Sequence, residues 1–177
     1  DRMPSFLLPG PDGALVSLDD LLQGGPVVIS FNRGHWCPFC KIELRTIIAY
    51  HAEIAAHGGR VGSILPERQG FVGQLESDTD GKLLILTDID NGYALSLGLV
   101  LWLGDRIKEL MRGRGLHLED VQGNDGWFVP LPATFVVAAD GTVVARRVDP
   151  DFRLRMDIDE ILSALRQLDN PNAPSGA

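Results

Sequence analysis

The chain has 177 residues, of which 45% are hydrophobic and 23% charged, and this is the size and composition of one globular domain. Its net charge of −8 and its lack of a basic tract argue against a nucleic-acid-binding groove. The most apolar stretch, residues 95–103, is far shorter than the roughly 20 residues that cross a bilayer. We therefore expect no membrane partner and a cytoplasmic location.

The first half of the chain alternates between strand and helix patterns. Turn residues at Pro9–Gly13, followed by an apolar stretch, predict a small N-terminal hairpin. A β-branched run at 26–31 predicts a buried strand, and the apolar positions beyond Cys40 recur at helical spacing until Gly58, which predicts one helix of about five turns. Further on we expect a strand at 60–65, a loose helix around 71–75 and a strand at 83–87.

Residues 99–127 are the hardest segment to assign. A short helical pattern at 91–98 precedes them. Within the segment, Ile107, Leu110 and Met111 fall on one face of a helix, whereas glycines break the remainder into loops. We therefore expect an insertion with one helix and otherwise irregular structure before the C-terminal hairpin.

The C-terminal part of the chain predicts a hairpin and a helix. Apolar runs at 133–137 and 142–145 flank a turn and form the hairpin, and a last amphipathic helix follows at 158–168. Proline, glycine and asparagine dominate what comes after. We therefore divide the chain into one domain, residues 1–168, and a flexible tail, residues 169–177.

The element order predicts an α/β fold with a central mixed sheet and helices on both faces. In open sheets of this kind, ligand chemistry collects at the carboxyl ends of the strands. The strand at 26–31 ends just before the octet Arg33–Cys40, whose sequence Arg-Gly-His-Trp-Cys-Pro-Phe-Cys contains the only two cysteines of the chain. This octet is therefore the expected site.

Two thiols separated by two residues, where a strand leads into a helix, can open and close a disulfide reversibly. If Cys37 caps the helix, Pro38 takes the first helical position, where its missing N–H costs nothing. The free N–H groups and the positive helix end then lower the pKa of Cys37. Cys40 lies one turn deeper, so we expect an exposed Cys37 to attack and a more buried Cys40 to resolve the product.

Two other interpretations of the cysteine pair stay open. Half of a zinc site needs two further ligands, and the four histidines of the chain show no paired spacing. Two inert core cysteines are disfavoured by the strand-to-helix position and by Pro38 between them. Neither alternative explains the motif as well as redox chemistry does.

The neighbours of the cysteines have several candidate roles. His35 either tunes Cys37 or is a bystander. Arg33 either holds the thiolate or an oxyanion, or pairs with one of the many carboxylates. Trp36 is expected to pack as a lid beside the sulfur.

Trp36–Cys40, Trp-Cys-Pro-Phe-Cys after an apolar strand, resembles the thioredoxin fold, and the element order matches that fold from about residue 26 to residue 168. Three segments are more specific, because together they resemble the peroxiredoxin-like branch of the alkyl hydroperoxide reductase and thiol-specific antioxidant (AhpC/TSA) family. They are Phe31–Cys40, Leu131–Val137 and Val148–Phe152. The resemblance implies one thioredoxin-like redox domain.

The resemblance also implies roles for individual residues. Cys37 takes the peroxidatic role and Cys40 the resolving role, with Arg33, Trp36, Pro38 and Pro132 supporting the site. A cis peptide bond between Leu131 and Pro132 is expected to face the cysteines.

The motif also departs from typical peroxiredoxins. Those carry a proline seven residues before the peroxidatic cysteine, a threonine or serine three residues before it, and an arginine that opens the hairpin strand. Here Ser30, Gly34 and Pro132 stand at these positions. Arg33 is the candidate to compensate for the missing peroxide-polarising groups, and Pro132 is the residue that thioredoxin-like disulfide exchangers have there.

Two enzymatic functions and one non-enzymatic function follow. The first is reduction of hydroperoxides by the Cys37 thiolate, with Cys40 as resolving thiol and an external thioredoxin-like or glutathione-like reductant. The second is thiol–disulfide exchange with protein or small-molecule disulfides. The third is a redox-sensing or binding module, or a zinc protein. For the enzymatic functions we expect no cofactor and no metal ion, and we consider a homodimer because related folds commonly dimerise.

Overall fold

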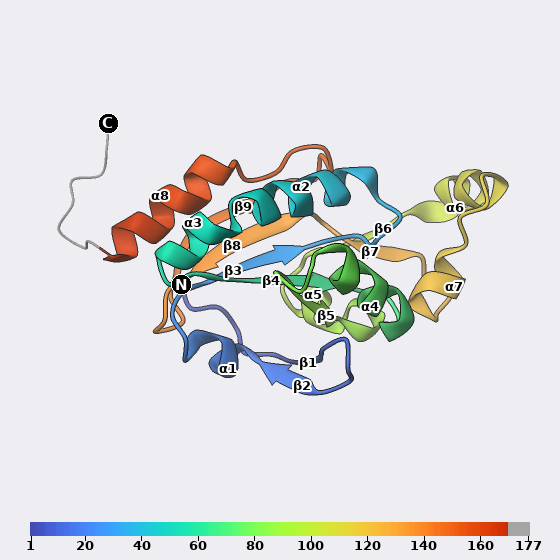
Figure 1. Ribbon diagram of the computed structural model, residues 1–177. Helices are drawn as coiled ribbons and strands as arrows, with labels where there is room; N and C mark the ends of the chain where they lie inside the picture. The colour runs from blue at the N-terminus through green and yellow to red at the C-terminus, as the bar shows by residue number, and fades with distance from the viewer. Residues whose placement is uncertain (170–177) are drawn as a thin grey trace.

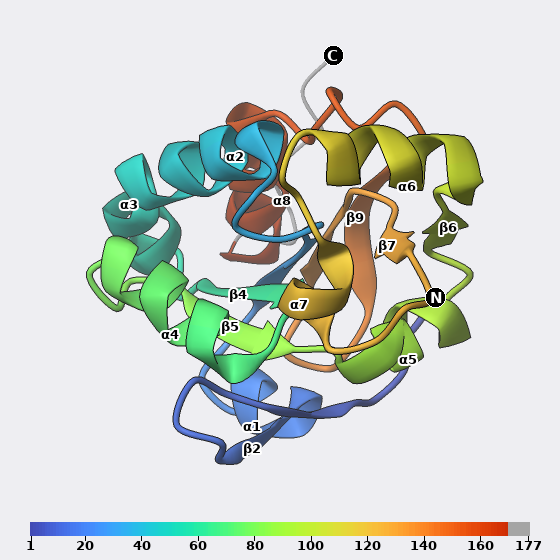
Figure 2. The ribbon, with the colours of Figure 1, turned by 90° about the vertical axis from the view of Figure 1, so that its right-hand side faces the viewer.

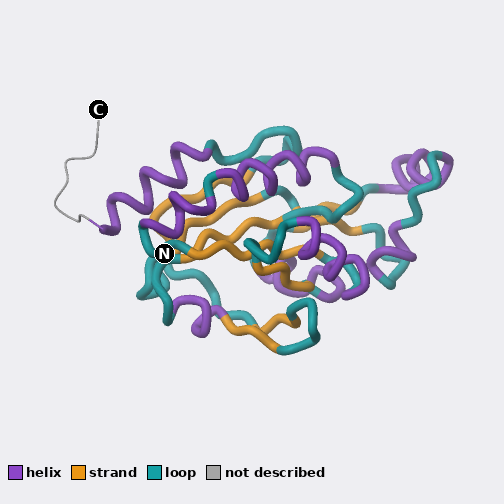
Figure 3. The backbone as a smooth tube through the Cα atoms, in the orientation of Figure 1, coloured by secondary structure: helices purple, strands orange, loops and turns teal. Residues whose placement is uncertain are grey.

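The computed structural model describes residues 1–169, without the side chains at positions 74 and 76–78. Its strands are β1 (Leu7–Pro9), β2 (Leu15–Ser17), β3 (Val27–Phe31), β4 (Arg60–Leu65), β5 (Leu84–Thr87), β6 (Val100–Trp102), β7 (Phe128–Pro130), β8 (Ala133–Val137) and β9 (Val143–Val148). Its helices are α1 (Leu18–Leu22), α2 (Pro38–Ala49), α3 (His51–Ala56), α4 (Gln69–Asp78), α5 (Gly92–Ser96), α6 (Gly104–Gly113), α7 (Leu118–Gln122) and α8 (Ile158–Asp169), with a 3-10 turn η1 (Ile89–Asn91). Figure 3 shows how helices and strands alternate along the backbone.

A five-stranded sheet in the order β5-β4-β3-β8-β9 forms the centre of the molecule (Figure 1). β3, β4 and β5 run parallel, and β8 is antiparallel to both β3 and β9, so the sheet is mixed as predicted. The register pairs Phe31, the last residue of β3, with Ile64 on one side and with Ala133 on the other. The motif therefore leaves the sheet from its central strand.

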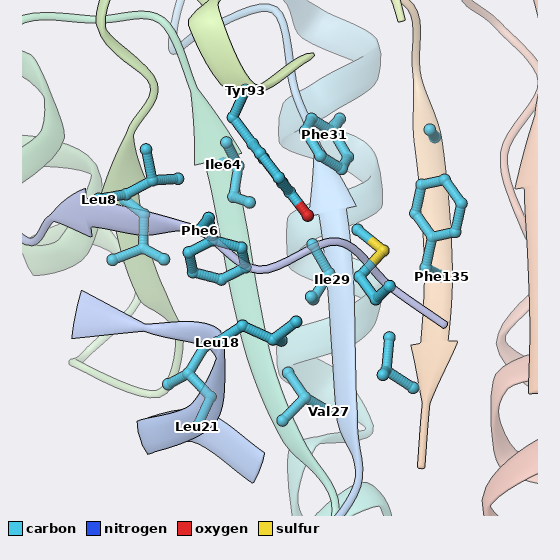
Figure 4. Packing of buried hydrophobic residues seen from close by; sticks show 14 of the residues in the cluster. Phe6, Leu8, Leu18, Leu21, Val27, Ile29, Phe31, Ile64, Tyr93 and Phe135 are labelled. Carbon is cyan, nitrogen blue, oxygen red and sulfur yellow. The ribbon is translucent and has the colours of Figure 1, made fainter. Parts of the chain in front are cut away.

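Alternate residues of β3 pack on opposite faces of the sheet, as the period of a strand requires. Val27, Ile29 and Phe31 enter one apolar cluster, and Val28 enters the other. The first cluster lies against β1, α1 and α5, and in Figure 4 the Tyr93 ring of α5 lies close to Phe31. The second cluster is covered by α2, α3, α4 and α8. Helices thus cover both faces and hold β3 rigidly under the motif.

Both predicted hairpins are present. β1 and β2 pair antiparallel, with Leu7 opposite Ser17, and β8 and β9 do the same near the C-terminus. Ser17 also begins α1, because its hydroxyl accepts the Asp20 N–H while the Asp20 carboxylate accepts the Ser17 N–H. This reciprocal capping box links the hairpin directly to the first helix.

The prediction of a single helix after the motif is wrong, because the structure has two helices there, α2 and α3. Tyr50 lies between them with φ −102° and ψ 10°, values outside the α-helix. Ile47 of α2 and Ile54 of α3 nevertheless belong to the same apolar cluster. The apolar periodicity therefore continues across the break, which is why the sequence pattern indicates one helix.

The segment at 99–127 contains more regular structure than predicted. α6 confirms the helix of Ile107, Leu110 and Met111, but α7 is also helical, and β6 pairs antiparallel with β7, which begins directly after the segment. The two strands have three residues each, too few to show an alternating pattern. Figures 1 and 2 place this insertion beyond the end of the sheet where β3 leads into α2.

The expected cis bond between Leu131 and Pro132 is wrong, because the peptide bonds of the described residues are all trans. The Leu131 N–H donates to the Leu99 carbonyl at 2.8 Å, and the Pro132 carbonyl accepts the Asp149 N–H at 3.3 Å. These bonds hold the connection between β7 and β8 with the trans isomer, which most X–Pro bonds prefer.

Two further expectations concern the C-terminal tail and a membrane partner. Asp169 ends α8, and the rest of the predicted tail, residues 170–177, lies outside the described residues. The division into a domain of residues 1–168 and a tail therefore stays a prediction. None of the described helices combines the length and the apolar character that a membrane span needs.

The central strand provides a test of the fold. Ile29 of β3 is completely buried, whereas Ile42 of α2 is 59% exposed. We expect Ile29→Ala to lower the free energy of unfolding by about 2–5 kcal/mol, because it leaves a cavity between the sheet and its cover. The matched control Ile42→Ala is expected to change it by less than about 0.5 kcal/mol. Urea unfolding followed by circular dichroism measures both, and equal losses would contradict this placement of β3.

Candidate active site

The octet Arg33–Cys40 joins β3 to α2, at the carboxyl end of the central strand. Cys37 is the N-cap of α2 with extended backbone angles, and Pro38 takes the first helical position, as predicted. The Cys37 N–H donates to the Gly34 carbonyl, and its own carbonyl accepts the Lys41 N–H, both at 3.1 Å. Both cysteines are free thiols. The backbone of Cys37 is therefore held on both sides while its sulfur remains free to react.

The surroundings of Cys37 favour its thiolate. The Cys40 thiol donates a hydrogen bond to the Cys37 sulfur, and this bond is the largest cause that lowers the pKa of Cys37. Burial opposes it, whereas the N–H groups of Cys40 and Phe39 and the charge of Arg33 lower the pKa further, to about 6. The predicted effect of the helix start thus contributes, but the second cysteine contributes more. These interactions favour the thiolate of Cys37 over the thiol relative to an ordinary cysteine.

Cys40 keeps its proton while Cys37 is ionised. The hydrogen bond to Cys37, together with burial, raises the pKa of Cys40 well above its ordinary value. Two donors nevertheless point at the Cys40 sulfur, the Arg33 backbone N–H at 3.4 Å and the Arg155 Nη2 at 3.5 Å. The charge of Arg155 lowers the pKa of Cys40.

The expected exposure of Cys37 is wrong, because Cys37 is only 2% exposed and Cys40 1%. The segment between β9 and α8 packs against the motif. Its Phe152 ring lies 4.7 Å from the Arg33 guanidinium carbon and 5.3 Å from the Phe39 ring. Sequence patterns do not reveal that a segment more than 110 residues away covers the cysteines.

Arg33 is a buried cation beside the cysteine pair. Burial lowers its pKa, and negative charge on Cys37 and Cys40 raises it. Among the described residues no carboxylate forms an ion pair with it, and its Nε has no hydrogen-bond partner. The face of Phe152 offers partial compensation through a cation–π contact. Of the two roles considered, the structure favours the interaction with the thiolate over pairing with a carboxylate.

His35 is bound by Glu67, a residue that the sequence did not indicate. The Glu67 side chain is fully buried, and both of its oxygens accept the His35 N–H at 3.1 Å. His35 Nδ1 lies 2.7 Å from Glu67 Oε1, and its ring stacks on Phe71 of α4. Burial raises the pKa of Glu67, and its bonds to His35 lower it. His35 therefore anchors the motif to the segment after β4.

Gly34 departs from the typical motif for a steric reason. Its φ of +137° favours glycine, and a Cβ there would collide with Glu67 Oε1 and lie 2.7 Å from Trp36 Nε1. A threonine or serine therefore does not fit this loop. Trp36 itself is half-buried and packs against the insertion, on the cluster of Leu118, Trp127 and Val129.

The motif departs from typical peroxiredoxins at two other positions, Ser30 and Pro132, which lie in or next to the sheet under the motif. Pro132 directly precedes β8, whose Ala133 pairs with Phe31, so it lies at the end of the sheet that carries the cysteines. Ser30 is completely buried in β3, and its hydroxyl accepts the Asn32 side-chain N–H at 2.8 Å. The Ser30 side chain also lowers the pKa of Glu43 of α2.

The buried Glu43 and the largely buried Arg155 form an ion pair next to Cys40. Arg155 Nε lies 2.9 Å from Glu43 Oε2, and the two side chains are 12% and 5% exposed. Glu43 Oε1 accepts the Thr134 hydroxyl of β8 at 3.0 Å. Burial raises the pKa of Glu43, and Arg155 and Thr134 lower it. One signal was available, because Glu43 lies three residues after Cys40 and four before Ile47, on the apolar face of α2.

The zinc interpretation finds no support in the part of the chain that the structure describes. There, no three histidine, cysteine, aspartate or glutamate side chains gather as a metal site. His35 is engaged by Glu67, and His57 lies 2.6 Å from Asp169 at the other end of the molecule. The further ligands that half of a zinc site requires are thus not gathered at the cysteine pair.

Comparison with known proteins provides independent evidence about the family of this chain. The family model described as the AhpC/TSA family matches residues 1–146, a region that includes the cysteine motif and the insertion. None of the curated proteins matches the sequence significantly.

Solved structures with a similar fold include three peroxiredoxins. Peroxidoxin BcpB of Mycobacterium tuberculosis is 22% identical with a TM-score of 0.74, over 95% of this chain and 96% of that one. Peroxiredoxin 6 of Arenicola marina is 16% identical with a TM-score of 0.74, over 96% and 72%. Peroxiredoxin Q of Xanthomonas campestris is 16% identical with a TM-score of 0.66, over 91% and 89%. These likenesses confirm the predicted thioredoxin-like α/β fold.

The ionisation of Cys37 can be measured directly. We expect the thiolate absorbance at 240 nm to rise with a midpoint near pH 6, and Cys40→Ser to move this midpoint upward, because the largest cause that lowers the pKa of Cys37 is weakened. Cys37→Ser, the control, is expected to show no transition near pH 6. A wild-type midpoint near the ordinary value of about 8.5 would contradict the geometry described above.

Proposed function

Because this chain belongs to the AhpC/TSA family and is a thiol peroxidase of the peroxiredoxin kind, we propose that Cys37 reduces hydroperoxides and that Cys40 is its resolving thiol. The observation that supports this proposal most directly is the position of Cys37 at the N-cap of α2 with Cys40 one turn further, where the Cys40 side chain lowers the pKa of Cys37. It leaves one sulfur charged for the first step and the other protonated within reach for the second. Two cysteines with these different protonation states are what the proposed cycle requires.

In the first step, the Cys37 thiolate attacks one oxygen of the hydroperoxide. The S–O bond forms as the O–O bond breaks, Cys37 becomes a sulfenic acid, and the alkoxide or hydroxide that leaves takes up a proton to give an alcohol or water. Developing negative charge needs polar groups arranged beforehand. Arg33 supplies a buried positive charge and an Nε without a partner among the described residues. It takes over the role of the peroxide-polarising side chains that typical peroxiredoxins have where this chain has Gly34 and Pro132.

In the second step, Cys40 attacks the sulfur of the Cys37 sulfenic acid. A disulfide forms, and the hydroxyl leaves as water with the Cys40 proton. An external reductant, a thioredoxin-like dithiol or a glutathione-like thiol, then restores both thiols by disulfide exchange. The cytoplasm supplies such reductants, so we place the protein there.

Replacing each cysteine tests the two roles. Cys37→Ser is expected to abolish hydrogen peroxide consumption in the presence of a thiol donor. In the absence of a thiol donor, Cys40→Ser is expected to consume one peroxide per protein and to retain a sulfenic acid, because that acid has no thiol partner. Dimedone labelling with mass spectrometry detects this acid. Ile42→Ala, which changes an exposed side chain, is the control for effects of mutagenesis and purification. Peroxide turnover by Cys37→Ser at the wild-type rate would rule out the proposal.

Thiol–disulfide exchange is the second candidate, and the position of Pro132 favours it. This residue precedes β8 where typical peroxiredoxins have an arginine, and it lies at the end of the sheet that carries the cysteines. Stopped-flow oxidation of the reduced protein separates the two functions, with hydrogen peroxide in one series and glutathione disulfide in the other. Faster oxidation by the disulfide would select this second candidate.

A further inference from the structure

We propose that Arg155 is a catalytic residue of the second step, where its guanidinium stabilises the negative charge that Cys40 carries as it attacks the oxidised Cys37. This inference rests on the proposed function, because it assigns the group that activates the resolving thiol. Arg155 lies outside the cysteine motif, in the segment between β9 and α8, and reaches the motif from 115 residues away.

The contacts at the Cys40 sulfur suit a thiolate better than a thiol. Arg155 Nη2 and the Arg33 backbone N–H donate to it from 3.5 and 3.4 Å. A neutral thiol sulfur is a weak acceptor, whereas an anionic sulfur benefits from each donor. Cys40 is also 1% exposed, so no bulk water is available to solvate the charge. The two protein donors therefore provide the solvation that a Cys40 thiolate needs.

Glu43 holds Arg155 in this position. Its Oε2 lies 2.9 Å from Arg155 Nε, and its Oε1 is fixed by the Thr134 hydroxyl at 3.0 Å. The guanidinium thus forms an ion pair with the carboxylate through Nε and a hydrogen bond with the sulfur through Nη2. Because Glu43 is buried and Arg155 is only 12% exposed, the ion pair restricts the movement of the arginine away from Cys40. Glu43 is accordingly a positioning residue.

The charges around the pair explain when Arg155 acts. In the reduced protein the hydrogen bond with Cys37 and the charge on it raise the pKa of Cys40, along with burial. Conversion of Cys37 to a neutral sulfenic acid removes that charge. Burial still opposes ionisation, but Arg155 and the Arg33 N–H remain and favour it. Oxidation of the first cysteine therefore releases the second to ionise against Arg155, immediately before it is needed.

The step balances without a further reactant. Cys40 gives up its proton, its sulfur forms the S–S bond with Cys37, and the S–O bond of the sulfenic acid breaks. The hydroxyl group leaves with a proton as water. Arg155 donates a hydrogen bond throughout and is itself unchanged.

Arg155→Met removes the charge and the donors while it keeps an unbranched apolar stem. A nearby opposite charge is worth about 1–3 pKa units, and a more basic thiolate recovers about half of the lost reactivity on a logarithmic scale. We therefore expect disulfide formation to slow about 3- to 30-fold. The oxidation of Cys37 by hydrogen peroxide is expected to keep its rate, and sulfenic acid to accumulate. Stopped-flow tryptophan fluorescence and dimedone trapping follow the two steps separately.

Removal of Arg155 alone leaves the Glu43 carboxylate buried without its cation, which can unfold the protein. The comparison is therefore repeated between Glu43→Gln and the double variant Glu43→Gln/Arg155→Met, in which no buried charge is stranded. Arg153→Met is the matched control, since Arg153 belongs to the same segment but pairs with Asp151 at the surface. Arg155→Lys is expected to restore part of the second-step rate, because it returns the charge.

A second measurement does not depend on peroxide at all. In a Cys37→Ser background, Arg155→Met is expected to raise the pKa of Cys40 by about 1–3 units, as measured by the 240 nm absorbance. An unchanged Cys40 pKa, or equal slowing of both steps in the folded double variant, overturns the assignment. If peroxide does not oxidise the wild-type protein, the proposed function is wrong, and the Cys40 pKa alone then decides whether Arg155 activates this thiol.

Discussion

The hydrogen bond between the Cys40 thiol and the Cys37 sulfur is the interaction on which the rest of the site depends. It exists because Cys37 caps α2 and Cys40 lies one turn further, a spacing that places the two side chains on one face of the helix. Pro38 allows the helix to begin immediately after Cys37. The five-stranded sheet fixes the origin of α2, since β3 is buried on both faces and ends just before the motif. The proton shared between the cysteines is thus a consequence of the fold.

Burial by itself disfavours the Cys37 thiolate on which this arrangement depends. A thiolate that is 2% exposed has lost most of its water, and burial by itself raises the pKa of Cys37. Hydrogen bonds from Cys40 and Phe39 and the charge of Arg33 more than compensate. The same cover that excludes water also strengthens these interactions, because charges act over a lower local dielectric constant.

The parts of the site that follow from local rules could be predicted, and the parts formed by distant segments could not. Helix capping at Cys37, the strand before it and the α/β class of the fold follow from the order and periodicity of local sequence patterns. Glu67 and Arg155 reach the motif over 32 and 115 residues, and no spacing in the sequence marks those contacts. The exposure of Cys37 was mispredicted for the same reason, since its cover belongs to a remote loop. The strands of the insertion are simply too short to show a period.

The charge of Arg33 acts on Cys37, and the charge of Arg155 acts on Cys40. Arg155 has Glu43 as a permanent counter-ion, whereas Arg33 has no carboxylate partner among the described residues. An unpaired cation in the interior is costly, and the Cys37 thiolate is the anion that offsets it. In the proposed disulfide both sulfurs are neutral, so Arg33 loses the anion that offsets its charge while Arg155 still repels it. On this proposal, the buried charges balance better in the dithiol than in the disulfide.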